Sequence, residues 1–574
     1  MAKRSGQIVG VSFISVALVA GCTVGEGSDD GSPAQVLQPE ASQDSDNPDR
    51  NLPLVVSDGA SGVAVSASSQ FFRRAPFAVV ADQGDIAAVV RAASIGVATS
   101  VPVLPLDPAD GSSVLTELER LGTATVLAVG DVPELDDVEI ITAPNSVGQL
   151  SDLVGVSFEE TEVSGLAEIG PALGRLDPSS PTLLTLTGSA EHSADARDAE
   201  EPDADELGAE TGENGSLPEF GRSELANPVL ALVAITDGES GSDAVQHIAA
   251  AATSKAAGAD LKVLGVPDPR ATGESVEALR EHSDSTVVAI GDHFGSVTEL
   301  RDRIEFALTV PELPGGGQLL YPGRRMIALY GHPGVPAMGV MGEQGPEESV
   351  ARAKELASQY DPFSDEKVIP ALEVIVTVAS VDPGTDNQYS NRSRVDDIRP
   401  WVEAARDTDT YVVLDLQPGR TDFLTQAKIY EELLAEPHVG LALDPEWRLR
   451  PDQVHLRQVG QVDASEINDV IEWLADLTAE NNLPQKLLIL HQFQTRMITN
   501  RADIDTSRDE VSVLIHADGH GVPEQKLDTW NVLKQDLPEG VWLGWKNFND
   551  EDSPTFTPEE TMDVSPSPWF VSYQ

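Results

Sequence analysis

Apolar strands and amphipathic helices alternate without a break from residue 326 to the end of the chain, and this alternation restricts the fold more than any other feature. Two parallel strands of one sheet need a crossover between them, which is usually a helix. Seven or eight strand–helix units fit into this stretch, and about 250 residues is the usual size of one (β/α)8 barrel. We therefore predict a TIM-like barrel over residues 318–574, after the glycine run at 315–317. The expected strands are residues 326–330, 371–379, 411–416, 439–444, 486–490, 511–515, 541–545 and 569–573.

Residues 52–314 carry further alternating strands and helices, so the fold class expected for the whole chain is α/β. The segments LGTATVLAVGD and HSDSTVVAIGD end two successive sets and form an internal repeat. Through Val126–Asp131 and Val287–Asp292, this pair resembles the cell-wall-binding repeat 2 modules of Gram-positive surface proteins. The resemblance implies parallel-sheet α/β units that bind the cell wall. That family usually carries three copies, and two are visible here. The residues alone also allow a generic three-layer α/β sandwich.

The N-terminus combines two basic residues, Lys3 and Arg4, with the apolar run Ile8–Ala20, which is short for a membrane-spanning helix. The run ends in Leu-Val-Ala-Gly-Cys, which resembles the lipobox of bacterial lipoproteins. The resemblance implies that residues 1–21 are a signal peptide and that Cys22 is lipidated after cleavage. We therefore expect a lipid-anchored protein of the cell membrane that faces the extracellular or cell-wall side. An uncleaved signal anchor is the alternative.

Two segments contain too few large apolar residues to build a core. Residues 22–51 are rich in Gly, Ser, Asp, Pro and Gln and are expected to be a tether between the lipid and the folded part. Residues 188–224 form an acidic insertion rich in Ala, Gly and Ser, for which we expect a surface loop.

The formal net charge of −58 excludes some classes of partner. A surface this acidic repels nucleic acid and anionic lipid head groups. We expect no nucleic-acid partner, membrane contact through the N-terminal lipid, and binding to cell-wall glycan or another envelope polymer. The sequence has no dinucleotide fingerprint, phosphate loop, nucleophile elbow or HExxH pair. Cys22 is the only cysteine, which excludes intramolecular disulfides and thiolate metal clusters. No cofactor and no metal site are predicted.

The strand expected at residues 439–444 ends in two acids within the sequence VGLALDPEW. Because successive side chains of a strand face opposite sides, Leu441 and Leu443 point one way while Asp444 and Glu446 point the other. Active sites of TIM barrels lie at the carboxyl ends of the strands. The pattern therefore predicts that both acids lie at the mouth of the barrel.

Polar and aromatic side chains also follow the other expected strands, and this concentration indicates a functional pocket. Asp415 is a further candidate for catalysis. The candidates for substrate binding are Tyr330, His332, Gln417, Trp447, His491, His516, Asp518 and Trp545.

The end of VGLALDPEW is similar to the D-G-x-D-x-D-x-E strand of chitinase-like glycoside hydrolases. The resemblance implies that Glu446 is the general acid. Cleavage of a glycosidic bond generally needs a second carboxyl group, for which Asp444 and Asp415 are the candidates. Trp447 is expected to raise the pKa of Glu446 by desolvation. The sequence therefore predicts a protein that binds and hydrolyses cell-wall glycan.

Two other functions stay open. Val439 and Ala442 stand where the chitinase-like family has its other acids, which favours a non-catalytic wall-binding or scaffolding lipoprotein. Glu373 is expected to face the barrel interior, where an ion pair is favoured over a role as a second acid. The second alternative is a metal-assisted hydrolase. Its candidate ligands are His332, Asp415, Asp444, Glu446, His491 and His516.

Overall fold

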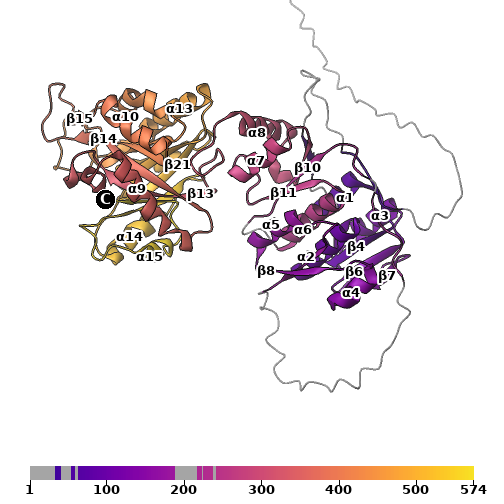
Figure 1. Cartoon of the computed structure of the whole chain (residues 1–574). Helices are drawn as coiled ribbons and strands as arrows, with labels where there is room; N and C mark the ends of the chain where they lie inside the picture. Colours follow the sequence, from indigo (N-terminus) through magenta and orange to yellow (C-terminus); the bar gives the residue numbers. More distant parts are fainter. Residues whose placement is uncertain (1–32, 40–52, 58–61, 188–215, 223, 237–240) are drawn as a thin grey trace, which may run out of the picture.

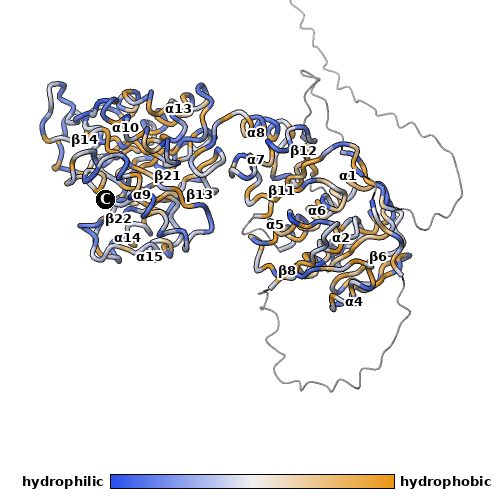
Figure 2. Tube along the Cα trace, viewed as in Figure 1, coloured by the Kyte–Doolittle hydropathy of each residue, from blue (hydrophilic) through white to orange (hydrophobic). Residues whose placement is uncertain are grey.

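The computed structural model describes residues 33–39, 53–57, 62–187, 216–222, 224–236 and 241–574, which form two lobes (Figure 1). Apolar residues gather in the interior of both lobes, and hydrophilic residues cover their surfaces (Figure 2). The predicted signal peptide, Cys22, most of the tether and residues 188–215 of the acidic insertion lie outside the described ranges. Within those ranges, no helix is both long and apolar enough to cross a membrane.

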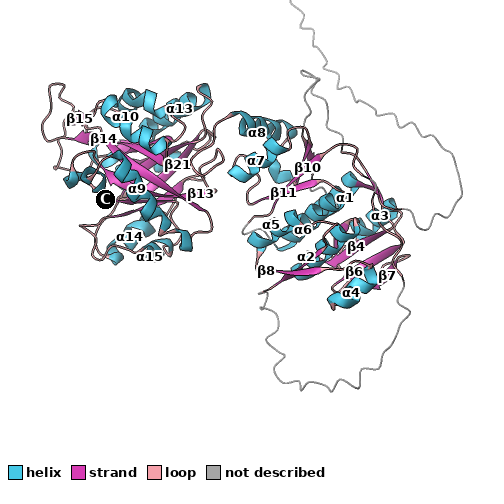
Figure 3. Ribbon diagram, viewed as in Figure 1, coloured by secondary structure: helices cyan, strands magenta, loops and turns pink. Residues whose placement is uncertain are grey.

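Eight parallel strands close into a barrel in the C-terminal lobe, which confirms the predicted TIM-like fold (Figure 3). The first strand pairs with the second on one side and with the last on the other, so the sheet closes on itself. Each expected strand overlaps an observed one. The strands are β13 (Arg324–Gly331), β14 (Lys367–Ala379), β16 (Tyr411–Leu416), β17 (Val439–Leu443), β19 (Lys486–Gln492), β21 (Val511–Ala517), β22 (Trp542–Asn547) and β23 (Phe570–Tyr573). The short β15 (Ser390–Arg392) pairs antiparallel with the end of β14.

Side chains alternate along these strands as the sequence predicted. Leu441 and Leu443 of β17 belong to the apolar layer between the strands and the surrounding helices. Ala442 faces the barrel axis and belongs to a separate apolar cluster inside the barrel, together with Tyr411 and Leu514. The helices are α9 (Pro346–Ser358), α10 (Val395–Arg406), α11 (Phe423–Ala427), α12 (Glu431–Leu434), α13 (Ala464–Glu480), α14 (Pro523–Leu533) and α15 (Pro558–Met562).

The N-terminal lobe contains two four-stranded parallel sheets, which confirms the predicted α/β class. The first sheet has the order β5 (Val103–Leu106), β4 (Phe77–Asp82), β6 (Thr125–Val129) and β7 (Glu139–Thr142). The second has the order β11 (Asp260–Leu264), β10 (Val229–Ala234), β12 (Thr286–Ile290) and β2 (Leu54–Val56). In each sheet the first strand of the unit leads into a long helix, α2 (Ile86–Thr99) after β4 and α6 (Gly241–Ala256) after β10.

A third, smaller unit was not predicted. It consists of the parallel strands β8 (Glu159–Val163) and β9 (Thr182–Leu186) with α5 (Leu166–Arg175) between them. The sequence hides this unit because β8 reads EETEV, with three glutamates, and α5 contains Pro171. Both features argue against regular elements in a sequence-based prediction.

Each of the three units packs one helix against an edge strand of another unit: α6 against β5, α2 against β9 and α5 against β11. Thr253 of α6 accepts a hydrogen bond from Val103 N of β5 (3.0 Å). Ser94 of α2 accepts one from Leu184 N of β9 (2.9 Å). The helix α5 packs against β11, where Gly170 permits the close approach. One apolar core of described residues extends through all three units.

The lobes meet at a buried glutamine. Gln318 N donates to Arg270 O in the N-terminal lobe (2.7 Å), and Gln318 O accepts from Gln485 N beside the barrel (3.0 Å). The remaining elements are β1 (Gln35–Val36), α1 (Val63–Phe71), β3 (Phe72–Arg74), α3 (Ser112–Leu121), α4 (Val147–Val154), α7 (Gly273–Glu281), α8 (Val297–Thr309), β18 (Val462–Asp463) and β20 (Ile498–Thr499).

Candidate active site at the carboxyl end of the barrel

A cavity of about 500 Å³ opens at the carboxyl ends of the barrel strands. Six of the residues predicted from the sequence line it together: Tyr330, Gln417, Asp444, Glu446, Trp447 and Asp518. The lining also includes Phe493, His520, Lys546, Phe548 and Glu551, which were not among the predicted site residues. The cavity therefore combines several carboxyl groups with aromatic rings.

The two acids of VGLALDPEW reach the cavity in different ways. Asp444 follows β17 directly and is buried against the barrel interior. Its Oδ1 accepts a hydrogen bond from Glu446 N (3.1 Å) and so caps the 3-10 turn Pro445–Trp447. Glu446 is therefore carried by this turn rather than by the strand. The cap fixes the direction in which the chain, and with it Glu446, leaves the barrel.

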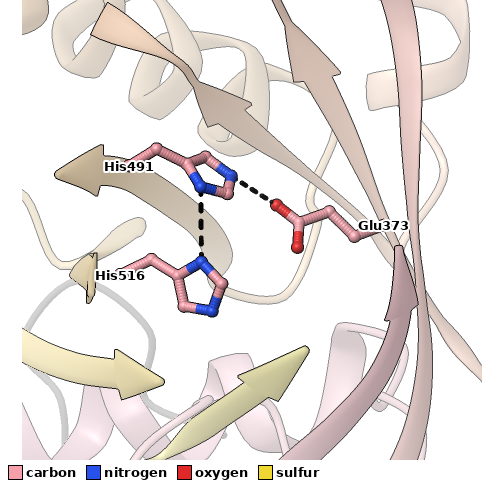
Figure 4. A group of neighbouring side chains, drawn as sticks. All are labelled: Glu373, His491 and His516. Carbon is pink, nitrogen blue, oxygen red and sulfur yellow. Dashed lines mark hydrogen bonds and ion pairs between the residues drawn. The ribbon is translucent and has the colours of Figure 1, made fainter. Parts of the chain in front are cut away.

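A chain of charged groups lies under and along the cavity. His491 Nε2 is 2.7 Å from Glu373 Oε1, and His491 Nδ1 is 3.1 Å from Asp518 Oδ2 (Figure 4 shows the first of these contacts). Asp518 Oδ1 is in turn 3.1 Å from Lys546 Nζ. The predicted ion pair of Glu373 is confirmed, with His491 as its partner. Glu373 and His491 are fully buried and do not line the cavity.

Lys546 also contacts Tyr330 at the end of β13, two strands away in the barrel. Its Nζ lies 3.6 Å from the centroid of the Tyr330 ring, a cation–π contact. The Tyr330 hydroxyl donates to Asp415 Oδ2 (3.0 Å). Asp415 is fully buried, and its Oδ1 has no hydrogen-bond partner. Asp415 therefore supports Tyr330 from below the cavity floor.

Three carboxyl groups of the site hold their protons more tightly than usual. Burial is the main cause in each case, because a charge is poorly solvated away from water. Burial and the nearby charge of Asp518 raise the pKa of Glu446 to about 7. Burial, with Glu373 as a further cause, raises the pKa of Asp415 to about 7. The pKa of Asp444 is raised well above its usual range by burial and then by Asp415 and Glu446.

Asp518 is ionised in spite of its burial. Burial opposes the charge, but Lys546 and His491 outweigh it and hold the pKa of Asp518 below its usual range. Burial likewise works against the Lys546 ammonium, while Asp518 and Glu373 raise the pKa of Lys546. Two carboxyl groups of one cavity, Glu446 and Asp518, are thus driven toward opposite charge states.

Five of the predicted residues do not line the cavity. They are Asp415 and His491, described above, and His332, Trp545 and His516. His332 contacts the neighbouring Pro333 O through Nδ1 (2.9 Å). Trp545 faces the helices, with its ring centroid 5.6 Å from that of Trp530. His516 lies deep in the barrel, with its Nε2 3.1 Å from Trp545 O. Lys546 is not among the predicted site residues, although it stands near the end of β22 beside Trp545 and lines the cavity. Its place at a strand end is the signal that could have identified it.

The comparisons with known proteins add little at the level of sequence. No protein-family model and no curated protein matches the chain. Among solved structures, the chain is similar to Cwp6 from Clostridium difficile, with 12% sequence identity, 71% of this chain and 66% of that chain covered, and a TM-score of 0.32. The match thus spans slightly less than two thirds of that protein. A likeness of this degree carries no argument about activity.

Proposed function

We propose that this chain is a lipid-anchored protein of the cell envelope whose barrel hydrolyses cell-wall glycan. One observation carries the enzymatic part. Glu446 and Asp518 line the same cavity, and their surroundings favour a protonated Glu446 and an ionised Asp518. Acid-assisted cleavage of a glycosidic bond requires one protonated and one ionised carboxyl group, and the pKa values of these two groups are shifted in those directions.

In this proposal Glu446 is the general acid. Its proton passes to the glycosidic oxygen as the bond from that oxygen to the anomeric carbon breaks. The Asp518 carboxylate, held by Lys546, supplies negative charge opposite the cationic anomeric centre. A water molecule then bonds to the anomeric carbon, and its proton passes to the Glu446 carboxylate, which regenerates the acid. Trp447, Phe493 and Phe548 offer apolar ring surface to the sugar faces.

The other two acids predicted as catalytic take supporting roles. Asp444 orients the turn that carries Glu446, and its raised pKa makes it a poor nucleophile. Asp415 is below the cavity floor and holds the Tyr330 hydroxyl. The second carboxylate of the reaction is therefore assigned to Asp518 rather than to Asp444 or Asp415.

A pair of substitutions tests this assignment. Glu446→Gln keeps the size of the side chain but removes its acidic proton, so release of reducing ends from purified wall polysaccharide is expected to fall by at least about 100-fold. Glu480→Gln, at an exposed residue that does not line the cavity, is the matched control and is expected to keep most of the activity. Equal activity in wild type and Glu446→Gln, or no cleavage of any wall glycan by wild type, would refute the proposal.

A non-catalytic wall-binding role is the second candidate, and the third unit of the N-terminal lobe favours it. The unit raises the count of α/β units from two to three, the number usual in the repeat family that the sequence resembles. The N-terminal lobe would then bind wall polymer with or without catalysis in the barrel. Pull-down with insoluble wall material is expected to fail for a chain that lacks residues 52–314. Retained pull-down would remove this role.

The anchor has its own test. Cys22→Ser removes the thiol to which the lipid would be attached. The variant is expected in the soluble fraction, whereas wild type sediments with membranes and incorporates labelled fatty acid. A variant that still sediments and remains labelled would contradict lipidation at Cys22.

A further inference from the structure

Glu373 of β14, His491 of β19 and His516 of β21 converge inside the barrel (Figure 4), and none of them lines the cavity. All three side chains are fully buried. One ligand-type atom from each lies within 4.8 Å of the others. Two imidazoles and one carboxylate are a donor set that binds Zn²⁺ and related transition metals.

Each histidine has one ring nitrogen on an acceptor outside the group and the other nitrogen facing the group, where His491 Nε2 contacts Glu373 Oε1. His516 Nε2 faces the carbonyl oxygen of Trp545 (3.1 Å), which can only accept, and the Ser572 hydroxyl (3.3 Å), so a hydrogen on Nε2 satisfies the carbonyl and leaves Nδ1 as an acceptor. His516 Nδ1 points to His491, 3.4 Å from its Nδ1. His491 Nδ1 faces the Asp518 carboxylate (3.1 Å) and therefore also carries a hydrogen. Metal-binding histidines are typically held in this way, by an acceptor behind the ring.

The third side chain is incompletely satisfied. Glu373 Oε2 is buried and has no hydrogen-bond partner. Among the described residues, the ion pair of Glu373 is with His491 and none is formed with a lysine or arginine, while the nearby Lys546 pairs with Asp518. Asp415, on the strand next to Glu373, also has a buried oxygen without a partner. Buried carboxylate oxygens of this kind call for a cation or a hydrogen-bond donor.

We propose that Glu373, His491 and His516 bind one divalent transition-metal ion, with Zn²⁺ as the ion that fits the donor set. A proton and the ion compete for the same pair of atoms. In the metal-free state a proton bridges His491 Nε2 and Glu373 Oε1, which are 2.7 Å apart. Ligand atoms about 2 Å from a tetrahedral ion are about 3.3 Å apart, so binding displaces this proton and moves the two atoms apart by about 0.6 Å.

The position of the ion defines its role. None of the three ligands lines the cavity, so the ion does not touch a substrate there. Instead it would orient His491, whose Nδ1–H then fixes the Asp518 carboxylate on the cavity wall. The site is thus a carboxylate–histidine–metal arrangement in which the ion positions Asp518. It stands apart from the proposed hydrolysis, because the ion can be present whether or not the barrel cleaves glycan.

Metal content of the full chain tests the site without reference to activity. Protein purified without chelators, with Zn²⁺ in the growth medium, is expected to hold about one equivalent of zinc per chain by mass spectrometry. Glu373→Gln and His516→Asn are each expected to lower this to less than about a tenth of an equivalent, while Glu551→Gln, outside the ligand set, retains it. Circular dichroism of each variant verifies the fold.

Cobalt provides a readout on the unmodified chain, so the test does not depend on variants that fold. Wild type refolded with Co²⁺ is expected to show the visible absorption of a four-coordinate ion, and Zn²⁺ is expected to remove it. The opposite result is also defined. Wild type that takes up neither ion, and whose His491 ring shows hydrogens on both nitrogens by NMR, would overturn the proposal and leave the group as an ion pair.

Discussion

Lys526 and Asp552 form a fully buried ion pair beside the cavity, with Nζ 2.9 Å from Oδ2. Lys526 Nζ also donates to Gly519 O (3.0 Å) and to Lys546 O (2.6 Å). Asp552 accepts from Gly521 N (2.9 Å) and from Phe548 N (2.9 Å). One pair of side chains therefore fixes the loops that follow β21 and β22, and these loops carry much of one cavity wall.

Removing one member of this pair is expected to leave the other charged and buried. Lys526→Met should lower the free energy of unfolding by about 3 to 5 kcal/mol, measured by urea denaturation. Arg406→Met is the control, because Arg406 pairs with Asp407 at the exposed surface, and the free energy of unfolding should stay nearly unchanged there. Equal effects of the two substitutions would show that the Lys526 pair does not hold the wall.

The raised pKa of Glu446 predicts the alkaline limb of the activity profile. Burial and Asp518 raise this pKa to about 7, so the general acid loses its proton as the pH rises through that value. We expect kcat/KM to be level just below pH 7 and to fall about tenfold per pH unit well above it. Hydrolysis of a soluble wall fragment between pH 5 and 9 measures this. A profile that rises through pH 7 would assign the acid to another group.

The sequence predicted the barrel well because each barrel strand is a compact apolar run bounded by turns. All eight expected ranges overlap observed strands. It missed the third N-terminal unit for the opposite reason, since β8 is an exposed strand with glutamates at Glu159, Glu160 and Glu162. Tertiary contacts, not apolar periodicity, hold that strand in place.

The site was predicted in part. Asp444 and Glu446 could be found because a single strand end carries both. The grouping of Glu373, His491 and His516 could not, because these residues come from three strands that only the closure of the barrel brings together. The charge state of Asp518 likewise depends on Lys546, which lies 28 residues further along the chain and across β21–β22.

Lys486 predicts a stability effect at the opposite end of the barrel. The side chain is fully buried at the start of β19, and its ammonium donates to Glu436 O. Burial lowers its pKa to about 7, whereas the unfolded chain has a lysine pKa of about 10.4. Between these values the unfolded chain binds the proton that the folded chain has released. The contribution of Lys486 to stability therefore rises with pH from about 7 to about 10 and is lowest, and constant, below pH 7.

Lys486→Met is expected to stabilise the chain at pH 6 by up to about 4 kcal/mol, because it removes the unfavourable buried charge. The advantage should shrink as the pH approaches 10, where wild type buries a neutral amine that keeps its hydrogen bond. Denaturant titrations of both proteins at pH 6, 8 and 9.5 measure the difference. Lys428→Met, at an exposed lysine, should show no such trend. A difference between Lys486→Met and wild type that is independent of pH would contradict the lowered pKa.

Trp447 and Trp545 were both predicted to contact sugar, and the structure separates them. Trp447 lines the cavity, with its ring centroid 5.4 Å from that of His455. Trp545 is 1% exposed and packs against Trp530 and Phe556, with Lys526 Nζ 4.9 Å from its ring centroid. Truncation should therefore act on binding at the first position and on folding at the second.

Trp447→Ala is expected to weaken binding of a wall oligosaccharide by about tenfold, since one stacking surface for a ring is lost, and to change stability little. Trp545→Ala should lower the free energy of unfolding by about 3 to 5 kcal/mol through the cavity it leaves, with near-normal affinity in the protein that remains folded. Calorimetric binding and denaturant titration of both variants separate the two effects. If Trp545→Ala loses affinity without losing stability, Trp545 faces the ligand rather than the helices.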